Sequence, residues 1–333
     1  MGYKKKILVV FGTRPEALKM IPVIKELKNS KSNVYFITKI CITGQHKEML
    51  DQVLDLFKIK PDYDLNLMTH NQTLSSLTSK ILISFQKVLK KFNPDLVLVH
   101  GDTNTTFSVS LSCSYNKISV GHVEAGLRTF NLNSPWPEEF NRQITSKLSN
   151  FHFAPTNLSR SNLLNENFSD KKIIVTGNTI IDTLFLTLKM LKKNKEVLNY
   201  FNTEHNINFD KKIILITGHR RENFGEGFLN ICDALIKLSK KYPKIDFVYP
   251  VHQNPNVKNI VLSKLSQNKN IRLIQPLDYI KFVFLMSKSN IILTDSGGIQ
   301  EEAPSLNIPV LVMRDTTERP EAIQYNKVKM VGT

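Results

Sequence analysis

Cysteine is scarce in this chain of 333 residues. Cys41, Cys113 and Cys232 lie far apart, and no CxxC pair occurs. This spacing favours neither a disulfide framework nor a zinc knuckle. We therefore expect a protein of a reducing compartment, the cytoplasm.

Long apolar segments are missing as well. The first apolar run, residues 7–11, is too short for a signal peptide and ends at Gly12-Thr-Arg-Pro. No stretch approaches the roughly 18 apolar residues that a membrane-spanning helix needs. Lys6 stands where an N-myristoylation signal requires Ser or Thr. We predict no export signal and no membrane insertion.

Arginine is sparse, although the chain is strongly basic. Lys and Arg number 45 against 29 Asp and Glu, a formal net charge of +16, yet only nine of the cations are Arg. An excess made of Lys is typical of a solvated surface, so we predict no nucleic-acid partner. Most arginines stand in short motifs rich in Gly, Pro, His and Glu, where guanidinium groups can bind phosphate or carboxylate. These are Arg14, Arg128, Arg142, Arg220, Arg221, Arg314 and Arg319.

Short β-branched runs alternate with amphipathic segments along the chain. Near-continuous apolar strands imply parallel sheets buried on both faces. The expected strands are residues 7–11, 34–38, 96–100, 119–123, 151–154, 173–176, 213–217, 247–250, 271–274, 291–294 and 310–312. A helix over 179–193 and a polar stretch to Asp210 separate the two halves. We predict an α/β fold of two doubly wound, Rossmann-like domains facing a cleft, over residues 1–178 and 179–333.

The end of the chain is expected to be incomplete. A strand is predicted near residues 328–331, and the sequence stops directly after it. A doubly wound sheet is normally covered by further helices on both faces. We therefore expect a C-terminal domain that is shortened at its end.

Motifs follow the expected strands directly. They are Gly12-Thr-Arg-Pro-Glu, His100-Gly-Asp-Thr, His122-Val-Glu-Ala-Gly-Leu-Arg, Gly218-His-Arg-Arg-Glu-Asn and Asp295-Ser-Gly-Gly. Open α/β sheets bind ligands at the carboxyl ends of their strands. The functional site is therefore expected at these positions.

One motif of the second domain predicts a phosphate site. Ser296, Gly297 and Gly298 stand at an expected helix start, where free backbone N–H groups and the helix dipole attract phosphate. The alternative is a plain Ser N-cap. Glu301 and Glu302 follow one turn later and can accept hydrogen bonds from ribose hydroxyls. A nucleotide diphosphate is the implied ligand.

No cofactor is expected. Gly12-Thr-Arg-Pro lacks the G-x-G-x-x-G of dinucleotide folds, which disfavours an NAD enzyme. The histidines form no HExxH pair, and His122-Val-Glu has no downstream PCxxC, so no catalytic metal is predicted. Asp62-Tyr-Asp is similar to the metal-binding DxD of some sugar transferases, but it follows a Lys-rich loop. We interpret it as a surface turn.

Four carboxylates indicate acid–base chemistry. Asp102, Glu124, Glu138 and Glu139 come from three consecutive segments of the first domain. Each alone is as readily a helix cap, but together they suggest proton transfer to and from a substrate. In the second domain, His219 stands beside two arginines, which favours phosphate binding over a solvated loop.

As a set, the motifs resemble those of the bacterial non-hydrolysing UDP-N-acetylglucosamine 2-epimerases, which have the glycosyltransferase-B fold. The matching stretches span essentially the whole chain: FGTRPEALKM, VHGDTNTTF, GHVEAGLRT, SPWPEEFNRQ, TGHRREN, VYPVHQNPNV, LTDSGGIQEEAPSL and RDTTERPEA. The resemblance implies reversible conversion of UDP-N-acetylglucosamine to UDP-N-acetylmannosamine, for surface polysaccharide synthesis, by a homodimer without nicotinamide or metal. No carbonyl activates the C2 proton, so the implied route eliminates UDP to give 2-acetamidoglucal and adds it back.

The resemblance also implies roles for single residues. Asp102, Glu124 and Glu138 would transfer protons or stabilise an oxocarbenium-like transition state, and His219 would neutralise the departing diphosphate. The residues implied in substrate binding are Arg14 and Lys19 near the diphosphate, Phe282 on uracil, the helix start at Ser296, Gly297 and Gly298, Glu302 at the ribose, and Arg319.

An effector site for UDP-N-acetylglucosamine lies beside the active site in this family. The residues that match parts of it are Gln45, His46, Gln72, Arg220 and His252. Asn71 stands where some members carry an Arg, so regulation is left open.

Three alternatives remain at this point. A retaining glycosyltransferase would use the same UDP site, but the crowded carboxylates leave little room for an acceptor. A hydrolysing epimerase would release free N-acetylmannosamine. A protein that has lost catalysis would only bind the UDP-sugar.

Overall fold

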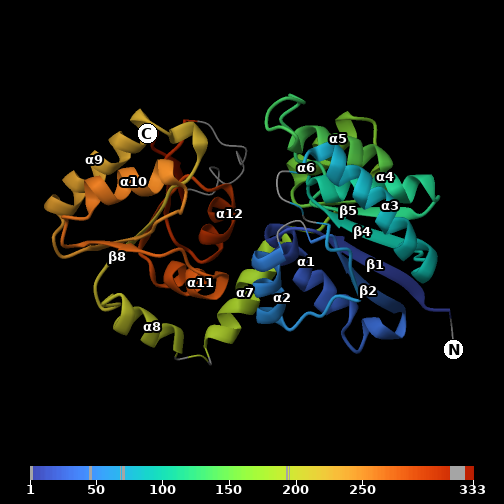
Figure 1. Ribbon diagram of the computed structural model, residues 1–333, viewed down its shortest axis with the longest axis horizontal. Helices are drawn as coiled ribbons and strands as arrows, with labels where there is room; N and C mark the ends of the chain where they lie inside the picture. Colours follow the sequence, from blue (N-terminus) through green and yellow to red (C-terminus); the bar gives the residue numbers. More distant parts are fainter. Residues whose placement is uncertain are drawn as a thin grey trace. The chain divides into compact units, whose positions relative to one another are not determined.

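A computed structural model of the chain describes residues 3–44, 47–67, 69, 72–192, 194, 196–315 and 327–333 (Figure 1). The chain divides into two compact units, Met1–Thr183 (unit 1) and Leu184–Thr333 (unit 2). The division falls inside helix α7 (Thr179–Leu191). The domain boundary after residue 178 stays a prediction.

Unit 1 carries a parallel sheet with the strand order β3-β2-β1-β4-β5-β6-β7. The strands are β1 (Lys5–Phe11), β2 (Phe36–Ile42), β3 (Tyr63–Asp64), β4 (Leu96–His100), β5 (Ser119–Val123), β6 (Phe151–Ala154) and β7 (Ile173–Val175). The order reverses between β1 and β4, which are hydrogen-bonded neighbours. Unit 1 therefore has the switch point at which doubly wound sheets bind ligands.

Helices cover both faces of this sheet. They are α1 (Arg14–Leu27), α2 (Lys47–Phe57), α3 (Leu74–Phe92), α4 (Asn104–Tyr115), α5 (Glu138–Leu148) and α6 (Asn157–Asn165). Leu8 and Val10 of β1 belong to a core cluster with residues of α3 and α4. Side chains alternate along a strand, so the equally buried Ile7 and Val9 face the opposite side, where α1 lies (Figure 1).

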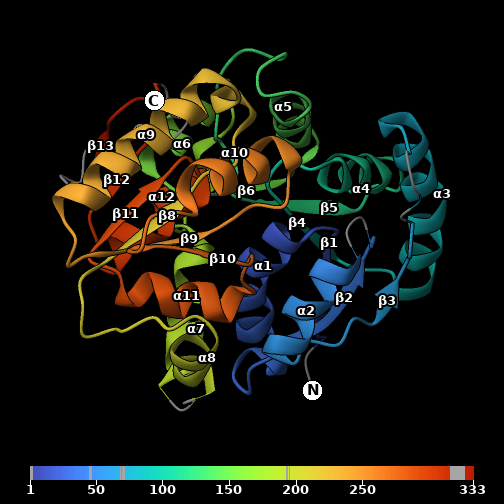
Figure 2. The same cartoon turned by 60° about the vertical axis from the view of Figure 1, so that its left-hand side comes forward.

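Unit 2 repeats the architecture with the strand order β10-β9-β8-β11-β12-β13. The strands are β8 (Ile213–Thr217), β9 (Asp246–Pro250), β10 (Ile271–Ile274), β11 (Ile291–Thr294), β12 (Val310–Val312) and β13 (Val328–Met330). The helices are α8 (Glu196–Glu204), α9 (Glu226–Lys241), α10 (Pro255–Leu265), α11 (Tyr279–Lys288) and α12 (Gly297–Ser305). Figure 2 shows α9 and α10 on one face of the sheet and α11 on the other. Here the switch point lies between β8 and β11.

These findings confirm the predicted fold class, an α/β protein with two Rossmann-like parallel sheets. Every strand pair within the described ranges is parallel. Apolar β-branched runs located most strands to within a residue, because a strand buried on both faces leaves a continuous signal.

The second strand was predicted wrongly at residues 34–38. Ser32–Val34 form a 3-10 turn instead, and the strand runs from Phe36 to Ile42. The two-residue strand β3 also lies within the Asp62-Tyr-Asp segment that we interpreted as a surface turn. A strand this short at a sheet edge has no hydrophobic period for the sequence to reveal.

The polar stretch before Asp210 contains helix α8, which the sequence did not predict. Its Phe201 is fully buried and stacks on Phe284 of α11, with ring centroids 5.7 Å apart. Two buried residues in nine make a weak helical pattern, so tertiary packing decides this element.

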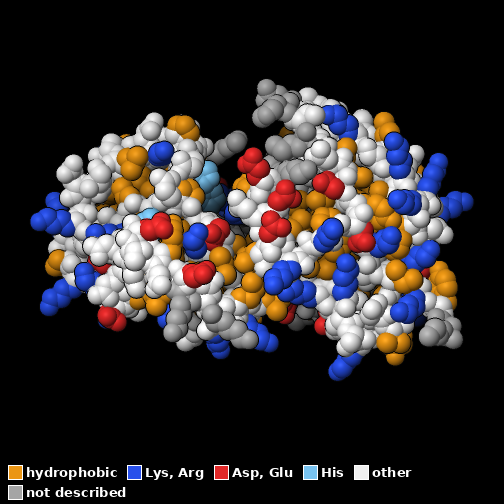
Figure 3. Space-filling model, turned by 60° about the horizontal axis from the view of Figure 1, so that its bottom comes forward, with side chains coloured by type: hydrophobic (Ala, Val, Ile, Leu, Met, Phe, Trp, Pro, Cys, Tyr) orange, Lys and Arg blue, Asp and Glu red, His pale blue; other side chains and the backbone are white. Residues whose placement is uncertain are grey.

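One face of the molecule shows how its charged side chains are distributed. On the face shown in Figure 3, Lys and Arg side chains are spread among neutral and apolar ones on both units. None of the described helices has the length and apolar character that a bilayer span requires.

Candidate active site

The motifs of unit 1 meet at its switch point. Gly12 follows β1, Gly101 follows β4 and Glu124 follows β5, and these three strands are neighbours in the sheet. Parallel strands end at one edge of a sheet, so the three turns lie side by side. The predicted position of the motifs at strand ends is confirmed.

A buried carboxylate that the sequence analysis missed ties two of these turns together. The backbone N–H groups of Gly12 and Thr13 donate to Glu16 Oε2 at 3.0 and 2.8 Å. The hydroxyls of Thr103 and Thr106 donate to Glu16 Oε1 at 2.7 and 3.2 Å. Burial raises the pKa of Glu16, against the lowering effect of these bonds. The signal available in the sequence was the capping box formed by Thr13 and Glu16.

Arg14 begins α1 at the rim of this edge. Its N-cap is Thr13, and Pro15 follows at a position where a helix tolerates proline. The Arg14 side chain is half-buried. The capped turn therefore fixes the backbone from which the predicted phosphate-binding guanidinium extends.

Asp102 is held by helix α5. Arg142 Nη2 donates to its carboxylate at 2.5 Å, and the Asn141 side-chain amide donates to its backbone carbonyl at 2.9 Å. Burial raises the pKa of Asp102; Arg142 lowers it, and the carboxylates of Glu124 and Glu138 raise it further. Glu124 and Glu138 thus lie close enough to Asp102 for their negative charges to disfavour its ionised form.

Glu138 and Glu139 are neighbours with different surroundings. Glu138 is the first residue of α5 and is half-buried. Glu139 is completely buried and accepts from the backbone N–H groups of Thr129 and Phe130 at 3.0 and 3.1 Å. Arg142 Nη1 also donates to Glu139, at 3.2 Å. Glu139 therefore holds a loop and an arginine, whereas Glu138 is the one open to a ligand.

Glu124 has an unusual backbone conformation. Its φ is 65°, in the left-handed region that non-glycine residues seldom occupy. Lys19 of α1 forms an ion pair with its carboxylate, and His100 Nε2 lies 3.8 Å from Glu124 Oε2. Burial lowers the pKa of His100 to about 4, which keeps the ring neutral. Backbone strain of this kind concentrates at functional sites.

Lys19 therefore contacts a predicted catalytic carboxylate within unit 1. Only 12 % of its side chain is exposed. The sequence analysis had connected Lys19 with the diphosphate through the resemblance alone. An ammonium group at Glu124 favours the ionised form of that carboxylate and fixes its orientation.

The motifs of unit 2 meet in the same way. His219 follows β8, and Asp295 follows β11, the neighbouring strand. Asp295 is fully buried, and its Oδ2 accepts from the backbone N–H groups of His219 and Arg220, both at 2.8 Å. The His219 ring stacks on that of His252, with centroids 5.4 Å apart.

Helix α12 begins where the sequence predicted. Ser296 is its N-cap, yet the Ser296 side chain makes no capping hydrogen bond. Gly298 at the first turn is exposed. The Ser296 side chain therefore does not cap this helix, and the phosphate-binding role of its first turn stays a prediction.

The predicted nucleoside contacts lie nearby in unit 2. Glu302 in α12 is 8 % exposed and accepts from the Tyr279 hydroxyl at 3.0 Å. Phe282 is half-buried and follows Tyr279 on α11 by three residues, on the same face of that helix. Tyr279 carried no motif signal and was missed.

Not all of the predicted residues belong to the described part of the chain. Gln45, His46 and Arg319 lie outside the described residues, as does Asn71. Gln72 accepts hydrogen bonds from Thr69 in a local turn of unit 1.

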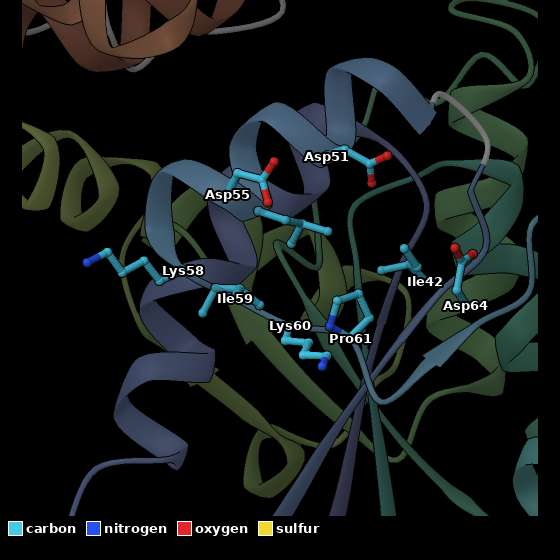
Figure 4. A pocket seen from close by; sticks show the side chains of 9 residues that line it. Ile42, Asp51, Asp55, Lys58, Ile59, Lys60, Pro61 and Asp64 are labelled. Atoms are coloured by element: carbon cyan, nitrogen blue, oxygen red, sulfur yellow. The ribbon is translucent and has the colours of Figure 1, made fainter.

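The described residues hold no group of three His, Cys, Asp or Glu arranged as a metal site. A cavity of about 750 Å³ lies beside α2 (Figure 4). Its lining includes the carboxylates of Asp51, Asp55 and Asp64 and the apolar side chains of Ile42 and Ile59. None of the predicted site residues lines it.

Comparison with known proteins gives consistent matches over the chain. The family model described as UDP-N-acetylglucosamine 2-epimerase matches residues 26–333. The chain is 53% identical to the UDP-N-acetylglucosamine 2-epimerase of Escherichia coli strain K12 over 329 residues, 98% of this chain and 87% of that protein.

Two solved structures are similar in sequence and shape. The Neisseria meningitidis UDP-N-acetylglucosamine 2-epimerase bound to UDP-N-acetylglucosamine is 57% identical, with a TM-score of 0.89, covering 98% of this chain and 87% of that one. The Methanocaldococcus jannaschii enzyme in complex with UDP-N-acetylglucosamine and UDP is 38% identical, with a TM-score of 0.82, covering 98% and 89%.

Proposed function

Because the chain belongs to the UDP-N-acetylglucosamine 2-epimerase family and is an isomerase, we propose that it interconverts UDP-N-acetylglucosamine and UDP-N-acetylmannosamine by eliminating and re-adding UDP. The observation that supports this most directly is the cluster of Asp102, Glu124 and Glu138 at the switch point of unit 1.

The route follows from the chemistry of the sugar. A base takes the C2 proton, the electron pair forms the C1=C2 bond, and the C1–O bond breaks, so that UDP leaves with its bonding electrons. The product is 2-acetamidoglucal. UDP then attacks C1 while a proton is delivered to the other face of C2, which inverts that carbon. Both steps balance without an oxidant, a reductant or a metal.

The carboxylates of unit 1 suit the proton transfers. Asp102 has a raised pKa, which makes it a stronger base once ionised, and Arg142 restrains it in one orientation. Glu124, paired with Lys19, is favoured as a persistent negative charge that stabilises an oxocarbenium-like transition state. Glu138 is the third candidate for a proton-transfer group.

The groups of unit 2 suit the departing diphosphate. We assign this role to His219 and the first turn of α12 at Ser296 and Gly297, because fixed donors stabilise developing charge best. The family resemblance also assigns Arg14 to diphosphate binding. Phe282 and Glu302 would bind the uracil and the ribose.

The wider setting follows from the same family. We propose that the protein acts in the cytoplasm as a homodimer and supplies UDP-N-acetylmannosamine for surface polysaccharides. Light scattering on the purified chain tests the dimer. The matches to Gln72, Arg220 and His252 leave an effector site as a subsidiary proposal.

Proton NMR of UDP-N-acetylglucosamine incubated with the protein in deuterated water tests the reaction. We expect UDP-N-acetylmannosamine with deuterium at C2, and the same rate after EDTA treatment and without NAD. Epimerisation without label would exclude the elimination. Release of free N-acetylmannosamine would indicate a hydrolysing epimerase. Transfer of the sugar to an added acceptor would indicate a glycosyltransferase. A UDP-sugar that binds but stays unchanged would indicate a protein without catalytic activity.

A further inference from the structure

One oxygen of the buried carboxylate in unit 2 is left without a hydrogen bond. Asp295 Oδ2 accepts from two backbone N–H groups and from the Asn223 side-chain amide at 3.3 Å. Asp295 Oδ1 is equally buried and accepts none within the described part of the chain. Burying an unsatisfied carboxylate oxygen is costly, and such an atom calls for an explanation.

His219 is the group that faces this oxygen. Its Nδ1 lies 3.4 Å from Asp295 Oδ1, while 39% of its side chain remains exposed. A small rotation of the ring would close this separation to a hydrogen bond, and catalytic hydrogen bonds often tighten only when the ligand arrives. The carboxylate that fixes the His219 backbone thus also points at its ring.

The stacked partner ring has the opposite surroundings. The backbone N–H of Asn254 donates to His252 Nδ1 at 3.1 Å, so that nitrogen must carry a lone pair. An imidazole that accepts at Nδ1 is neutral and protonated at Nε2. A carboxylate therefore faces Nδ1 of one ring, and an N–H group faces Nδ1 of the other.

We propose that Asp295 is a positioning residue for His219: its buried carboxylate holds the imidazole as the tautomer protonated on Nδ1 and turns Nε2, which carries the lone pair, toward the ligand. The assignment of a UDP-sugar as the ligand of Nε2 rests on the proposed function. The assignment of the tautomer does not. The bond to Asp295 then permits Nε2 to take up a proton from solvent as negative charge develops on UDP, and the protonated Nε2 donates to a phosphate oxygen.

The neighbouring charges are consistent with this role. Burial lowers the pKa of His219; Asp295 raises it, and His252 and Arg220 lower it. The Tyr249 hydroxyl donates to the Gly218 carbonyl at 3.2 Å beside this loop, and Glu222 within the loop forms an ion pair with Arg314. The ring is therefore neutral without ligand, and Asp295 is the group that favours its protonation.

Histidine-selective ¹⁵N NMR of the full chain tests the proposal. We expect His219 protonated at Nδ1 in the free protein and a rise of its pKa when UDP is added. In Asp295→Asn, the amide oxygen would accept from the two backbone N–H groups and the amide nitrogen would face the ring, so His219 should switch to the Nε2-protonated tautomer. We expect kcat to fall at least ~10-fold, with less change in KM.

Asn223→Ala is the matched control. It removes another hydrogen bond to Asp295 from the same loop but leaves the carboxylate, so the His219 tautomer should not change. Finding His219 protonated at Nε2 in the wild type overturns the proposal even if Asp295→Asn does not fold. An unchanged tautomer in a folded Asp295→Asn also overturns it. If the tautomers behave as expected but no epimerisation occurs, the proposed function fails and the positioning role stands.

Discussion

At the residue scale, Glu138 and Glu139 are adjacent glutamates with different surroundings, and we propose a catalytic role only for Glu138. Both are glutamates at the start of α5, but only Glu139 is completely buried and bonded to Thr129, Phe130 and Arg142. A shared sequence pattern thus covers two different roles. Burial and partners distinguish them, and neither can be read from adjacent letters.

We expect Glu138→Gln and Asp102→Asn to lower kcat by ~10²- to 10⁴-fold while UDP binding and the free energy of unfolding stay near wild type, since acid–base groups act in the transition state. Glu139→Gln should instead lower the free energy of unfolding by about 2–4 kcal/mol, because it leaves Arg142 and two backbone donors poorly matched. Turnover assays, UDP calorimetry and urea unfolding measure the three quantities. Near-normal turnover in both Glu138→Gln and Asp102→Asn would show that the proton-transfer groups lie elsewhere.

Residue type and position after a strand were enough to select Asp102 and Glu124 as candidates, and their catalytic roles stay predictions. The sequence did not reveal what holds them. The pairs Arg142–Asp102 and Lys19–Glu124 join residues 40 and 105 positions apart. The strand order of the sheet brings such partners together, and this order cannot be read from a single sequence.

At the element scale, the fold was predictable where a buried strand leaves an unbroken apolar run. It was not predictable where packing decides a polar segment, as in α8, or where an edge strand has two residues, as in β3. Turns behave similarly: the sequence shows a glycine, but only the structure shows whether the glycine is needed for its backbone or for its lack of a side chain.

Gly126 and Gly177 form a matched pair for that distinction. Both have left-handed backbones, with φ of 93° and 84°. A Cβ on Gly126 would lie 2.2 Å from the carbonyl oxygen of Ser159 at α6, whereas a Cβ on Gly177 would meet nothing within 4 Å. We expect Gly177→Ala to cost about 1–2 kcal/mol of stability and Gly126→Ala at least twice as much. If thermal unfolding shows equal losses of stability for the two variants, helix α6 must move aside for the new side chain at no energetic cost.

Buried histidines on the strands of unit 1 predict how the free energy of unfolding depends on pH. Burial lowers the pKa of His100 to about 4, of His122 to about 3 and of His152 to about 4. Between pH ~6.5 and ~4 the unfolded chain binds protons that the folded chain does not. The free energy of unfolding should therefore fall as the pH falls through this window, by up to about 1.4 kcal/mol per pH unit for each histidine.

His152→Leu should reduce the slope of the unfolding free energy against pH by the contribution of one histidine, because one fewer proton is taken up on unfolding. Neither ring nitrogen of His152 has a hydrogen-bond partner in the described structure, so its loss should change stability at pH 7 little. Phe168→Leu is the control, because it removes the same ring contact, of 4.7 Å between centroids, and keeps the titrating group. Urea unfolding at pH 5.5 and 7.5 measures both slopes, and an unchanged slope in His152→Leu would contradict the assignment.

At the scale of the whole molecule, the net charge of +16 and the sites for anions are separate features. Most of the cations are lysines, and on the face in Figure 3 the Lys and Arg side chains are spread among other residues. The proposed UDP contacts instead come from a helix start, a histidine and an arginine at strand ends. Positive charges scattered over a surface attract any polyanion weakly. Hydrogen-bond donors held in fixed positions at a switch point bind one kind of ligand specifically.

Salt should separate the two kinds of binding. We expect a 20-base-pair DNA duplex to bind weakly at ~20 mM salt and to be released by ~150 mM, because a scattered positive surface acts only through counterion release. UDP-N-acetylglucosamine, held by a few fixed donors, should lose far less affinity over the same range. Fluorescence anisotropy of labelled duplex and calorimetry of the UDP-sugar at both salt concentrations make the comparison. Duplex binding with a Kd below ~1 µM at ~150 mM would mean that the lysines form a nucleic-acid surface after all, since purely non-specific binding is weaker than that at physiological salt.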